Sequence, residues 1–400
     1  MINKKIIYIG NFSFPYGNAS GSRVFGNGCL LRELGYEVYF LGLDNELLQD
    51  VHLSETLKEY DGFKYYNFPY PLGMKGWLSF RKRYKQAVEL IQDLECSTVV
   101  LYGSPTISLF GNLLRKWCKK NSIILLADCV DWLSSGSGSF AYKLIKFVDN
   151  DYQKRILNSR TNGMIVISKY LSDFYQKKGV KTIILPPLIK RERYEALSST
   201  ISKSDKKYLI YIGQPFPTDG RKVQESSYKD RLDKVIELLG NLSSFDFVFD
   251  IYGITQHEYL SVIKNHDLVL DKLGEKIKFH GKIKNVLAIK KVAEADFTIL
   301  FRDKNRMTSA GFPTKFVETI SCGTPIITTN TSDLSDYLIN GENGFFVNID
   351  DQNLLKNKMK EILKLDRITV SNMKESCKKS SLFTHENYLD EMQKFMNSVT

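Results

Sequence analysis

The sequence predicts an α/β protein of two doubly wound parallel sheets in tandem, and three observations support this prediction. Short runs that are apolar throughout recur along the chain, which is the pattern of strands covered on both faces. Helical stretches lie between several of these runs, as the right-handed crossovers of a parallel sheet require. The run Tyr208–Gly213 (YLIYIG) closely repeats the composition of Ile6–Gly10 (IIYIG). The strand pattern therefore starts twice, and two Rossmann-like domains are expected.

The first domain is expected over residues 1–190. Its strands are predicted at Lys5–Gly10, Val38–Leu41, Phe63–Phe68, Thr98–Tyr102, Ile123–Ala127, Gly163–Ser168 and Thr182–Leu185. Helices are predicted between them, for example at Ser22–Leu34 and Tyr142–Asn158. Pro186-Pro187 ends the series, and the polar, charged stretch that follows indicates a linker over residues 191–206.

The second domain is expected over residues 207–383. Its strands are predicted at Tyr208–Gly213, Phe247–Tyr252, Lys276–His280, Asp296–Phe301, Pro325–Thr328 and Gly344–Val347. The last segment, Thr384–Met396, carries apolar residues on one face of a helix, so this helix must pack on another element.

The bulk composition is typical of a globular protein of two domains. The 400 residues suit two domains of about 200 each, and 43% of them are hydrophobic. No stretch approaches the roughly 20 apolar residues that span a bilayer. The segment Met1–Ile6 leads directly into a strand without the pattern of a signal peptide. A cytoplasmic protein is therefore expected.

Cysteine and histidine usage argues against a metal enzyme. The six cysteines are scattered without a C-x-x-C pair, so free buried thiols are expected in place of a zinc site or a disulfide framework. The five histidines are equally dispersed. No metal and no bound cofactor are expected.

Positive charge is concentrated in the first half of the chain. Residues 1–190 hold 25 of the 56 Lys and Arg residues but 16 of the 45 Asp and Glu residues, a surplus of nine out of a net charge of +11. This surplus indicates an anionic partner, either a membrane surface or an acidic acceptor. Nucleic acid is the competing interpretation, but the sequence has no zinc finger, ribonucleoprotein signature or helix-turn-helix pattern to support it.

The densest functional signal is the stretch Asp296–Val347. A strand is predicted to end near Phe301, and a loop containing Gly311 and Pro313 precedes a helix that starts around Thr314. Unpaired amides at such a helix start form an anion site, for which a diphosphate is the natural occupant. Glu318 lies one turn inside the helix, where its carboxylate can accept both hydroxyls of a ribose. The simpler interpretation is a plain turn and a solvated glutamate.

The stretch continues with a turn and a strand that favour the functional interpretation. Glu318 is followed by Ser321-Cys322-Gly323-Thr324-Pro325 and then Ile326-Ile327. This resembles glycosyltransferase family 4, retaining enzymes of the GT-B fold whose signature is Glu-x7-Glu, a small-residue turn, Gly-x-Pro and a strand. Glu318 takes the second Glu position, and Ala310 stands at the first, where the family uses Glu to hold the donor sugar or diphosphate.

The resemblance implies a donor site in the second domain. The donor would be a nucleotide diphosphate sugar, a UDP-sugar by default. The stretch Gly311-Phe312-Pro313-Thr314 would hold the phosphates through backbone N–H groups in place of the missing Glu. Lys315 would add charge there, or would face solvent.

The start of the second domain carries a further part of the resemblance. Tyr211-Ile212-Gly213 followed by Lys229-Asp230 resembles the family's strand, glycine turn and basic helix start. Lys229 would neutralise the leaving diphosphate, which is the main catalytic demand without a metal. The alternative is a surface lysine in the basic run Lys222–Lys234. Gln214 stands where the family often has Arg.

Three residues at the end of another predicted strand complete the expected donor site. His280, Gly281 and Lys282 resemble the family's strand end, where backbone groups meet the nucleotide base. A packed histidine at the strand end is favoured over a general base for His280.

In the first domain, the loop Asn11–Arg23 opens a helix but lacks a proper G-x-G-x-x-G. The resemblance implies that this loop closes over the donor phosphate and the acceptor. Its candidate residues are Gly17, Ser20, Gly21 and Arg23. Arg23 can equally be a surface residue at the start of the helix.

Two aspartates follow a predicted strand, at the sheet edge where parallel sheets bind ligands. Asp131 is the closer match to a residue that contacts the donor sugar or the acceptor in the family, and Asp128 is the second. Either can be a helix cap instead.

The segment Lys75–Lys85 (KGWLSFRKRYK) places Trp77 and Phe80 among basic residues. This mixture suits an anionic lipid surface. The alternative is a solvated helix face. Many members of the family use lipid-linked acceptors, which adds to the membrane interpretation.

The resemblance implies a retaining, metal-independent glycosyltransferase that acts on a glycan, a lipid-linked or a protein-linked acceptor, with the helix at about residues 384–400 crossing back to the first domain. Lys229, Glu318 and Asp131 are the expected catalytic residues. Three alternatives remain: a catalytically silent GT-B partner, for which Ala310 and Gln214 argue, a nucleotide-sugar epimerase, and a phosphorylase.

Overall fold

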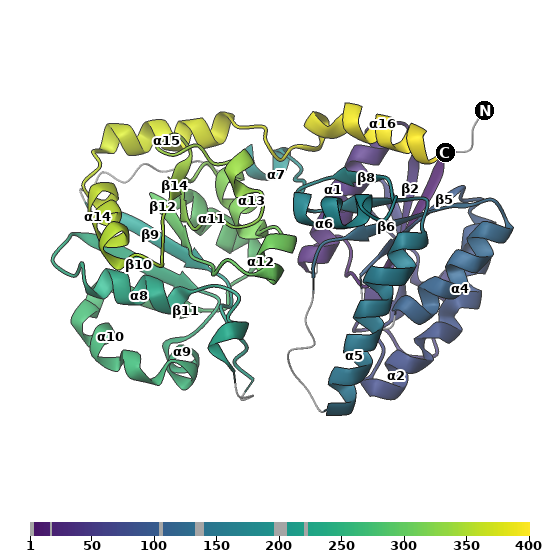
Figure 1. Ribbon diagram of the computed structural model, residues 1–400, viewed down its shortest axis with the longest axis horizontal. Helices are drawn as coiled ribbons and strands as arrows, with labels where there is room; N and C mark the ends of the chain where they lie inside the picture. Colours follow the sequence, from purple (N-terminus) through teal and green to yellow (C-terminus); the bar gives the residue numbers. More distant parts are fainter. Residues whose placement is uncertain (1–3, 17, 104–106, 133–139, 196–205, 220–222) are drawn as a thin grey trace. The chain divides into compact units, whose positions relative to one another are not determined.

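The computed structural model describes all residues except 1–3, 17, 104–106, 133–139, 196–205 and 220–222 (Figure 1). The described chain divides into two compact units. Unit 1 comprises residues 1–190, 310–312 and 383–400, and unit 2 comprises residues 191–309 and 313–382.

Unit 1 is built on an eight-stranded sheet with the order β3-β4-β2-β1-β5-β6-β7-β8. Its strands are β1 (Lys5–Gly10), β2 (Glu37–Asp44), β3 (Lys58–Tyr60), β4 (Phe63–Pro69), β5 (Thr98–Tyr102), β6 (Ile124–Cys129), β7 (Gly163–Val166) and β8 (Thr182–Ile184). All the pairings are parallel except β3 with β4. The sequence did not predict β3, because its three residues are all exposed and form no apolar run.

Helices cover both faces of this sheet. They are α1 (Ala19–Glu33), α2 (Gly73–Ser79), α3 (Tyr84–Asp93), α4 (Ile107–Lys120), α5 (Phe140–Tyr152), α6 (Lys169–Gln176) and α16 (Leu389–Val399). Helix α1 begins where the Asn18 side chain accepts a 2.8 Å hydrogen bond from the amide of Gly21. The C-terminal helix α16 lies against unit 1, where Met392 and Phe395 join the core that contains Ile6 (Figure 1).

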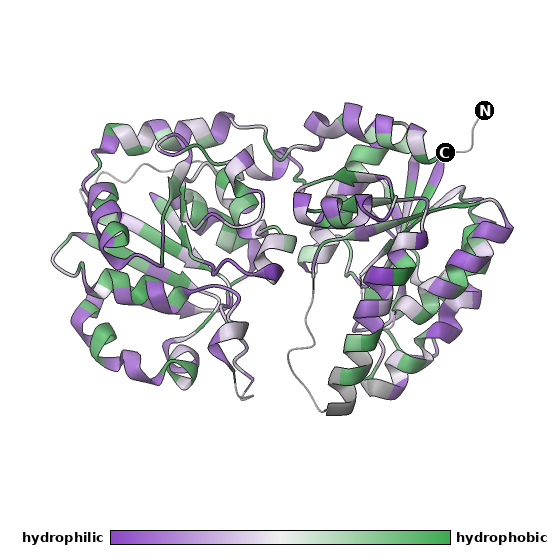
Figure 2. Cartoon of the chain, in the orientation of Figure 1, coloured by the Kyte–Doolittle hydropathy of each residue, from purple (hydrophilic) through white to green (hydrophobic). Residues whose placement is uncertain are grey.

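Strand alternation divides the core of unit 1 into two layers. Ile6 and Tyr8 face the layer shared with α1 and α16, whereas Ile7 and Ile9 face the layer shared with α3 and α4. The inner strands therefore bury both of their faces, which explains the continuous apolar runs in the sequence. Figure 2 shows the same division, with hydrophobic strands inside and hydrophilic residues on the outer faces of the helices.

Unit 2 has a six-stranded sheet with the order β11-β10-β9-β12-β13-β14, in which the paired strands run parallel. Its strands are β9 (Lys207–Ile212), β10 (Phe247–Tyr252), β11 (Ile277–Gly281), β12 (Phe297–Leu300), β13 (Ile326–Thr328) and β14 (Gly344–Phe346). Its helices are α7 (Glu192–Glu195), α8 (Leu232–Gly240), α9 (Gln256–Val262), α10 (Asp267–Leu273), α11 (Asn285–Glu294), α12 (Arg306–Ala310), α13 (Thr314–Ser321), α14 (Gln352–Leu363) and α15 (Arg367–Lys379). The predicted α/β class with two doubly wound parallel sheets is confirmed.

Three further properties bear on function. All six cysteines are buried and none of them forms a disulfide, as the sequence indicated. Within the described ranges, no helix is long and apolar enough to cross a bilayer. In the same ranges, no group of three or more His, Cys, Asp and Glu side chains is placed to hold a metal ion.

Candidate functional site

A buried carboxylate surrounded by cations lies at the carboxyl edge of the unit 2 sheet. Asp230 is 1% exposed. The Tyr211 hydroxyl donates to its Oδ2 at 2.8 Å, and Arg302 Nε donates to its Oδ1 at 2.8 Å. Lys315 Nζ forms an ion pair with Oδ2. Although burial opposes ionisation, the Lys315 ammonium and the Arg302 guanidinium hold the pKa of Asp230 well below its usual range.

Lys315 reaches this network from the first turn of α13. Its Nζ also donates to the Tyr211 hydroxyl at 3.1 Å. Burial lowers the pKa of Lys315 to about 8, with further lowering by Arg302 and Lys229 against the opposing effect of Asp230. Two cations therefore contact one carboxylate, and a third, Lys229, acts electrostatically on Lys315. The repulsion among these positive charges favours the binding of an anion.

Gly213 makes room for Lys315. The residue follows β9 with φ +143°, and a Cβ atom there would lie 2.0 Å from Lys315 Nζ. Its amide donates to the carbonyl of Tyr252 at 2.9 Å. A side chain at position 213 would displace the ammonium, so the ammonium occupies the space that the glycine leaves.

Lys229 is held at the same edge by the backbone around it. Its amide donates to the Pro215 carbonyl at 2.8 Å, and the Arg231 amide donates to the Phe301 carbonyl at 2.8 Å. These bonds tie the segment to the loops that follow β9 and β12. The Lys229 side chain is exposed, and none of the described carboxylates forms an ion pair with it.

Glu318 lies in α13, one turn after Lys315, and is partly exposed. Burial raises the pKa of Glu318, and the charges of Arg193 and Lys315 act in the opposite direction. Lys315 thus interacts electrostatically with both Lys229 and Glu318. The structure brings these two predicted residues together around a third.

The start of α13 presents backbone donors to this cluster. Pro313 is the N-cap residue and provides no side-chain cap. The amides of Thr314 and Lys315 lie in the first turn, where a helix offers no internal acceptor. Gly311 is partly exposed, whereas Phe312 is buried and its ring packs 6.2 Å from that of Phe383.

The remaining predicted donor residues lie at the ends of β9 and β11. Gln214 is exposed and donates to Thr218 Oγ1 at 3.0 Å. His280 stacks on Tyr252 at 4.4 Å between ring centroids, with its Nε2 3.1 Å from Asp250 Oδ1. The imidazole ring therefore stacks on a neighbouring strand, although the residue itself is exposed.

Lys282 is exposed, whereas the backbone amide and carbonyl of Gly281 already form hydrogen bonds within unit 2. The Gly281 amide donates to Ile254 at 3.2 Å, and its carbonyl accepts from Gly253 at 2.7 Å. At this strand end, both His280 and Lys282 are exposed.

In unit 1, Arg23 and Asp128 pair with each other. Both are buried, and the guanidinium donates to Asp128 Oδ1 from Nε at 3.0 Å and from Nη2 at 2.9 Å. Asn27 Nδ2 donates to the other carboxylate oxygen at 3.0 Å. The expectation of a surface arginine or a helix-capping aspartate is therefore wrong, because each charge neutralises the other inside the unit.

Ser20 and Asp131 lie near Tyr102, the last residue of β5. Burial raises the pKa of Tyr102, as do the charges of Asp128 and Asp131, whereas a hydrogen bond with Ser20 lowers it. Gly21 is buried, and a Cβ atom there would lie 2.1 Å from the Ser13 carbonyl oxygen. Gly17 lies outside the described residues.

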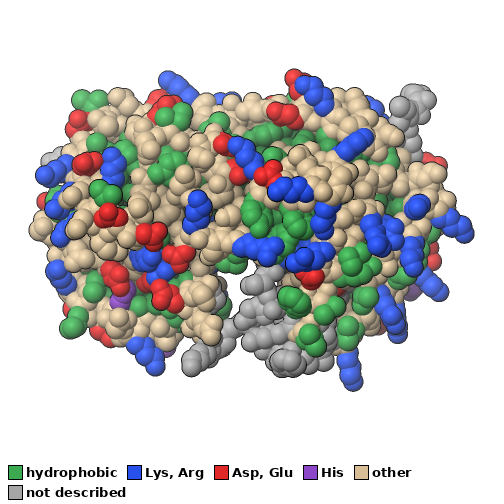
Figure 3. Space-filling model, viewed as in Figure 1, with side chains coloured by type: hydrophobic (Ala, Val, Ile, Leu, Met, Phe, Trp, Pro, Cys, Tyr) green, Lys and Arg blue, Asp and Glu red, His purple; other side chains and the backbone are tan. Residues whose placement is uncertain are grey.

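The segment Lys75–Lys85 differs from its prediction. Phe80 is buried, with its ring 5.7 Å from Phe68 and 5.5 Å from Phe110. Trp77 is partly buried against Tyr70. The aromatic side chains expected at a lipid surface thus pack inward, because the segment is a short helix and turn that covers the sheet. The basic side chains remain at the surface, and Figure 3 shows Lys and Arg prominent on unit 1.

Sequence reasoning missed three members of the unit 2 cluster. Asp230 follows Lys229 directly, and Arg302 follows the end of a predicted strand, so the rule that ligands bind at the carboxyl edge could have found Arg302. Arg193 lies in the stretch assigned to the linker, where nothing marked it.

Comparison with known proteins identifies the second unit. Residues 198–380 match the family described as Glycosyl transferases group 1. No curated protein is similar enough in sequence to match the chain.

Solved structures resemble the whole chain. Sucrose-phosphate synthase from Thermosynechococcus elongatus aligns with a TM-score of 0.69 and 14% identity over 99% of both chains. A glycosyltransferase from Rickettsia africae aligns with a TM-score of 0.66 and 12% identity over 100% of both. HepE of Anabaena in complex with UDP and glucose aligns with a TM-score of 0.64 and 14% identity, covering 99% of this chain and 100% of that one. The chain therefore has the GT-B fold of these glycosyltransferases, and residues 198–380, which lie in its second unit, match the group 1 family.

Proposed function

We propose that the chain transfers a sugar from a nucleotide diphosphate donor, UDP foremost, that is held by unit 2. The observation that carries this proposal is that Lys315 and Arg302 both pair with the buried carboxylate of Asp230, while Lys229 acts electrostatically on Lys315. Its surplus of positive charge at the carboxyl edge of a parallel sheet suits a diphosphate. The likeness to a protein solved with UDP and glucose supports the choice of nucleotide.

Each residue of the cluster has a role in this proposal. Lys315 and Lys229 neutralise the diphosphate, together with the first-turn amides of α13. Arg302 is a positioning residue, because it fixes the carboxylate that orients Lys315. Glu318 accepts hydrogen bonds from the ribose hydroxyls.

The proposed reaction proceeds with retention and without a metal. The bond between the anomeric carbon and the donor phosphate oxygen breaks, and the nucleoside diphosphate leaves with the electron pair. The acceptor hydroxyl attacks from the same face and transfers its proton to the departing phosphate. The lysines stabilise the developing negative charge, so neither a side-chain base nor a divalent cation is required.

Unit 1 would then serve the acceptor, a glycan or a lipid-linked or protein-linked sugar. Asp131 and Ser20, near the carboxyl end of β5, are its candidate contacts. The exposed basic residues Lys75 and Lys85 would face an anionic membrane from the cytoplasmic side, where exposed Leu72 and Leu78 add apolar surface.

A thermal-shift titration with UDP, GDP and their sugar derivatives tests the proposal. In the presence of EDTA, UDP at about ten times its Kd is expected to raise the Tm by roughly 3–6 °C. Lys315→Ala and Lys229→Ala should abolish the shift and Glu318→Ala should reduce it, whereas Lys272→Ala, which removes an exposed lysine of α10, should leave it unchanged.

Two outcomes would contradict parts of the proposal. A shift that requires Mn²⁺ or Mg²⁺ contradicts the metal-independent mechanism. UDP binding without hydrolysis or transfer of any UDP-sugar favours the silent GT-B partner.

A further inference from the structure

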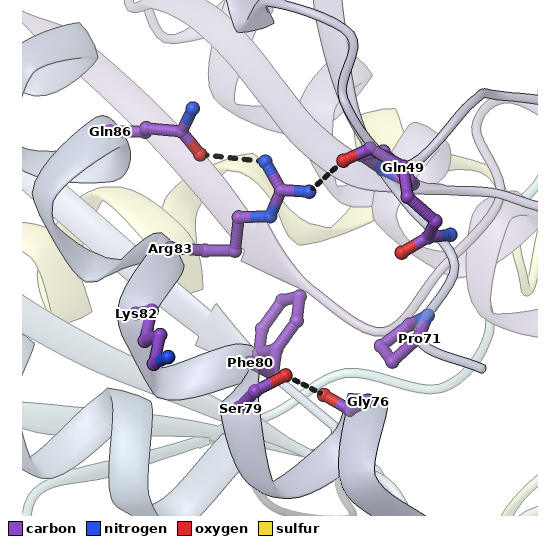
Figure 4. A pocket seen from close by; sticks show the side chains of 9 residues that line it. Gln49, Pro71, Gly76, Ser79, Phe80, Lys82, Arg83 and Gln86 are labelled. Atoms are coloured by element: carbon purple, nitrogen blue, oxygen red, sulfur yellow. Dashed lines mark hydrogen bonds between the residues drawn. The ribbon is translucent and has the colours of Figure 1, made fainter. Parts of the chain in front are cut away.

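Unit 1 contains a cavity of about 330 Å³ where β4 ends. The cavity lies among Gln49 after β2, Pro71 after β4, and Ser79, Phe80 and Arg83 at the end of α2 and in the turn that follows (Figure 4). The Phe80 ring and Pro71 form an apolar wall, whereas Gln49 and Arg83 provide polar groups.

Arg83 carries a positive charge that no carboxylate neutralises. Its Nη1 donates to Gln86 Oε1 at 3.0 Å, and its Nη2 donates to the Gln49 carbonyl at 2.8 Å, so both acceptors are neutral (Figure 4). Among the described residues, no carboxylate forms an ion pair with Arg83, which is itself partly buried. A guanidinium has five N–H donors, and three of them remain for a ligand.

Three other arginines of unit 1 pair with a carboxylate: Arg23 with Asp128, Arg32 with Asp61, and Arg155 with Asp151. Arg115, like Arg83, donates to a neutral acceptor, the Asn112 side chain. Arg83 differs from these four arginines because it lines this cavity. Desolvating a charge without a counter-ion is costly, so this geometry favours an anion in the cavity.

The chemistry around Arg83 points to a phosphate group. Lys82 lines the same cavity and adds a second positive charge. The Ser79 hydroxyl, which donates to the Gly76 carbonyl at 3.0 Å, lies at the rim and has lone pairs and a rotatable O–H. A planar guanidinium with an adjacent ammonium binds phosphate oxygens well.

We propose that this cavity binds a phosphate group of the acceptor, with Arg83 as its principal ligand. The assignment of this phosphate to the acceptor rests on the proposed function, whereas the phosphate site itself does not. The phosphate is carried either by a lipid or by a soluble phosphorylated sugar. Leu72, which precedes α2, and Leu78, which lies in α2, are both exposed. They provide apolar surface for a lipid that carries the phosphate.

Binding of sn-glycerol phosphate in the presence of saturating UDP tests the site, because UDP occupies the diphosphate cluster of unit 2. Calorimetry should show Arg83→Gln weakening the affinity by about tenfold or more, as expected for the loss of a charge-assisted contact. Arg81→Gln is the matched control, because it removes the same charge from the same turn outside the cavity lining. The affinity of Arg81→Gln for sn-glycerol phosphate should differ from that of the wild type by less than about twofold.

Vesicles distinguish the two sources of phosphate. If the phosphate is lipid-borne, sedimentation with phosphatidylglycerol vesicles should be weakened by Arg83→Gln far more than by Arg81→Gln, and phosphatidylcholine vesicles should not bind. If Arg83→Gln weakens the binding of sn-glycerol phosphate but not of the vesicles, the source is a phosphorylated sugar.

If Arg83→Gln and Arg81→Gln lose equal affinity for the phosphate probes, the proposal is overturned in favour of a diffuse basic surface. The proposal is also overturned if the wild-type protein binds neither sn-glycerol phosphate nor phosphatidylglycerol vesicles. UDP titration of Arg83→Gln should match the wild type. Loss of UDP binding in all proteins, with Arg83-dependent phosphate binding retained, would reject the donor proposal and keep this site.

Discussion

Arg302 Nε donates a 2.8 Å hydrogen bond to Oδ1 of the buried Asp230, while the other oxygen of that carboxylate pairs with Lys315. One carboxylate thus sets the positions of two cations that come from different elements, the loop after β12 and the first turn of α13. Asp230 itself need not touch the ligand to control how the ligand is bound. This arrangement leads to specific expectations for stability and for donor binding.

Asp230→Asn is expected to destabilise the protein by about 3–5 kcal/mol, because it leaves buried cations without their counter-charge. Urea unfolding monitored by circular dichroism measures the change. Asp246→Asn, at an exposed carboxylate, is the control and should stay within about 0.5 kcal/mol of the wild type. A loss below about 1 kcal/mol for Asp230→Asn would show that the network is not structurally important.

The stabilisation by Asp230 should depend on pH in one direction. The folded-state pKa of this carboxyl is depressed, so its contribution is fully present above the unfolded value of about 3.8 and is lost as the pH falls towards the folded value. The stability difference between wild type and Asp230→Asn should therefore be constant near neutral pH and shrink on acidification below about pH 4. A difference that grows on acidification is incompatible with this pairing.

UDP affinity is expected to fall as the pH rises through about 8, because Lys315 has a pKa of about 8 and its protonated form attracts the diphosphate. Isothermal titration from pH 6.5 to about 9.5 measures this, with a limiting loss of about tenfold per pH unit for one proton. Lys315→Arg keeps the charge over this range and should flatten the profile. An unchanged profile in that variant would assign the titration to another group.

Glu318→Ala should remove discrimination at the ribose. Wild-type protein is expected to bind UDP about tenfold more tightly than 2′-deoxy-UDP, because a carboxylate that accepts from the hydroxyls loses a charge-assisted bond. In Glu318→Ala the two ligands should bind about equally. If the variant still distinguishes them, the ribose contact lies elsewhere.

Gly213→Ala is expected to displace Lys315, because the new Cβ atom would lie 2.0 Å from Nζ at a φ of +143°. UDP affinity should fall at least as far as in Lys315→Ala. Gly341→Ala is the matched control, since this glycine also has a positive φ, +82°, but nothing lies within 4 Å of the added atom. The double variant Gly213→Ala/Lys315→Ala should lose less UDP binding free energy than the sum of the losses in the two single variants, because both substitutions act on the same contact.

The sequence by itself determined the strands and the start of α13. Short apolar runs such as Val99–Leu101 and Phe247–Phe249 occur because both faces of each sheet are covered, and this is visible without coordinates. The helix start at Thr314 follows from the preceding Gly311 and Pro313, which are local signals. The exposed edge strand Lys58–Tyr60 had no such signal.

Only the tertiary structure decided which charges meet. Arg302 and Lys315 flank Asp230 although they lie 72 and 85 positions away along the chain, and Arg23 finds Asp128 at a separation of 105. Ion pairs of this kind depend on the order of strands in a sheet and not on local sequence, so the sequence showed the residues but not their partners. Tertiary packing also explains Phe80, which is buried against Phe110 although the composition of its segment indicated a surface.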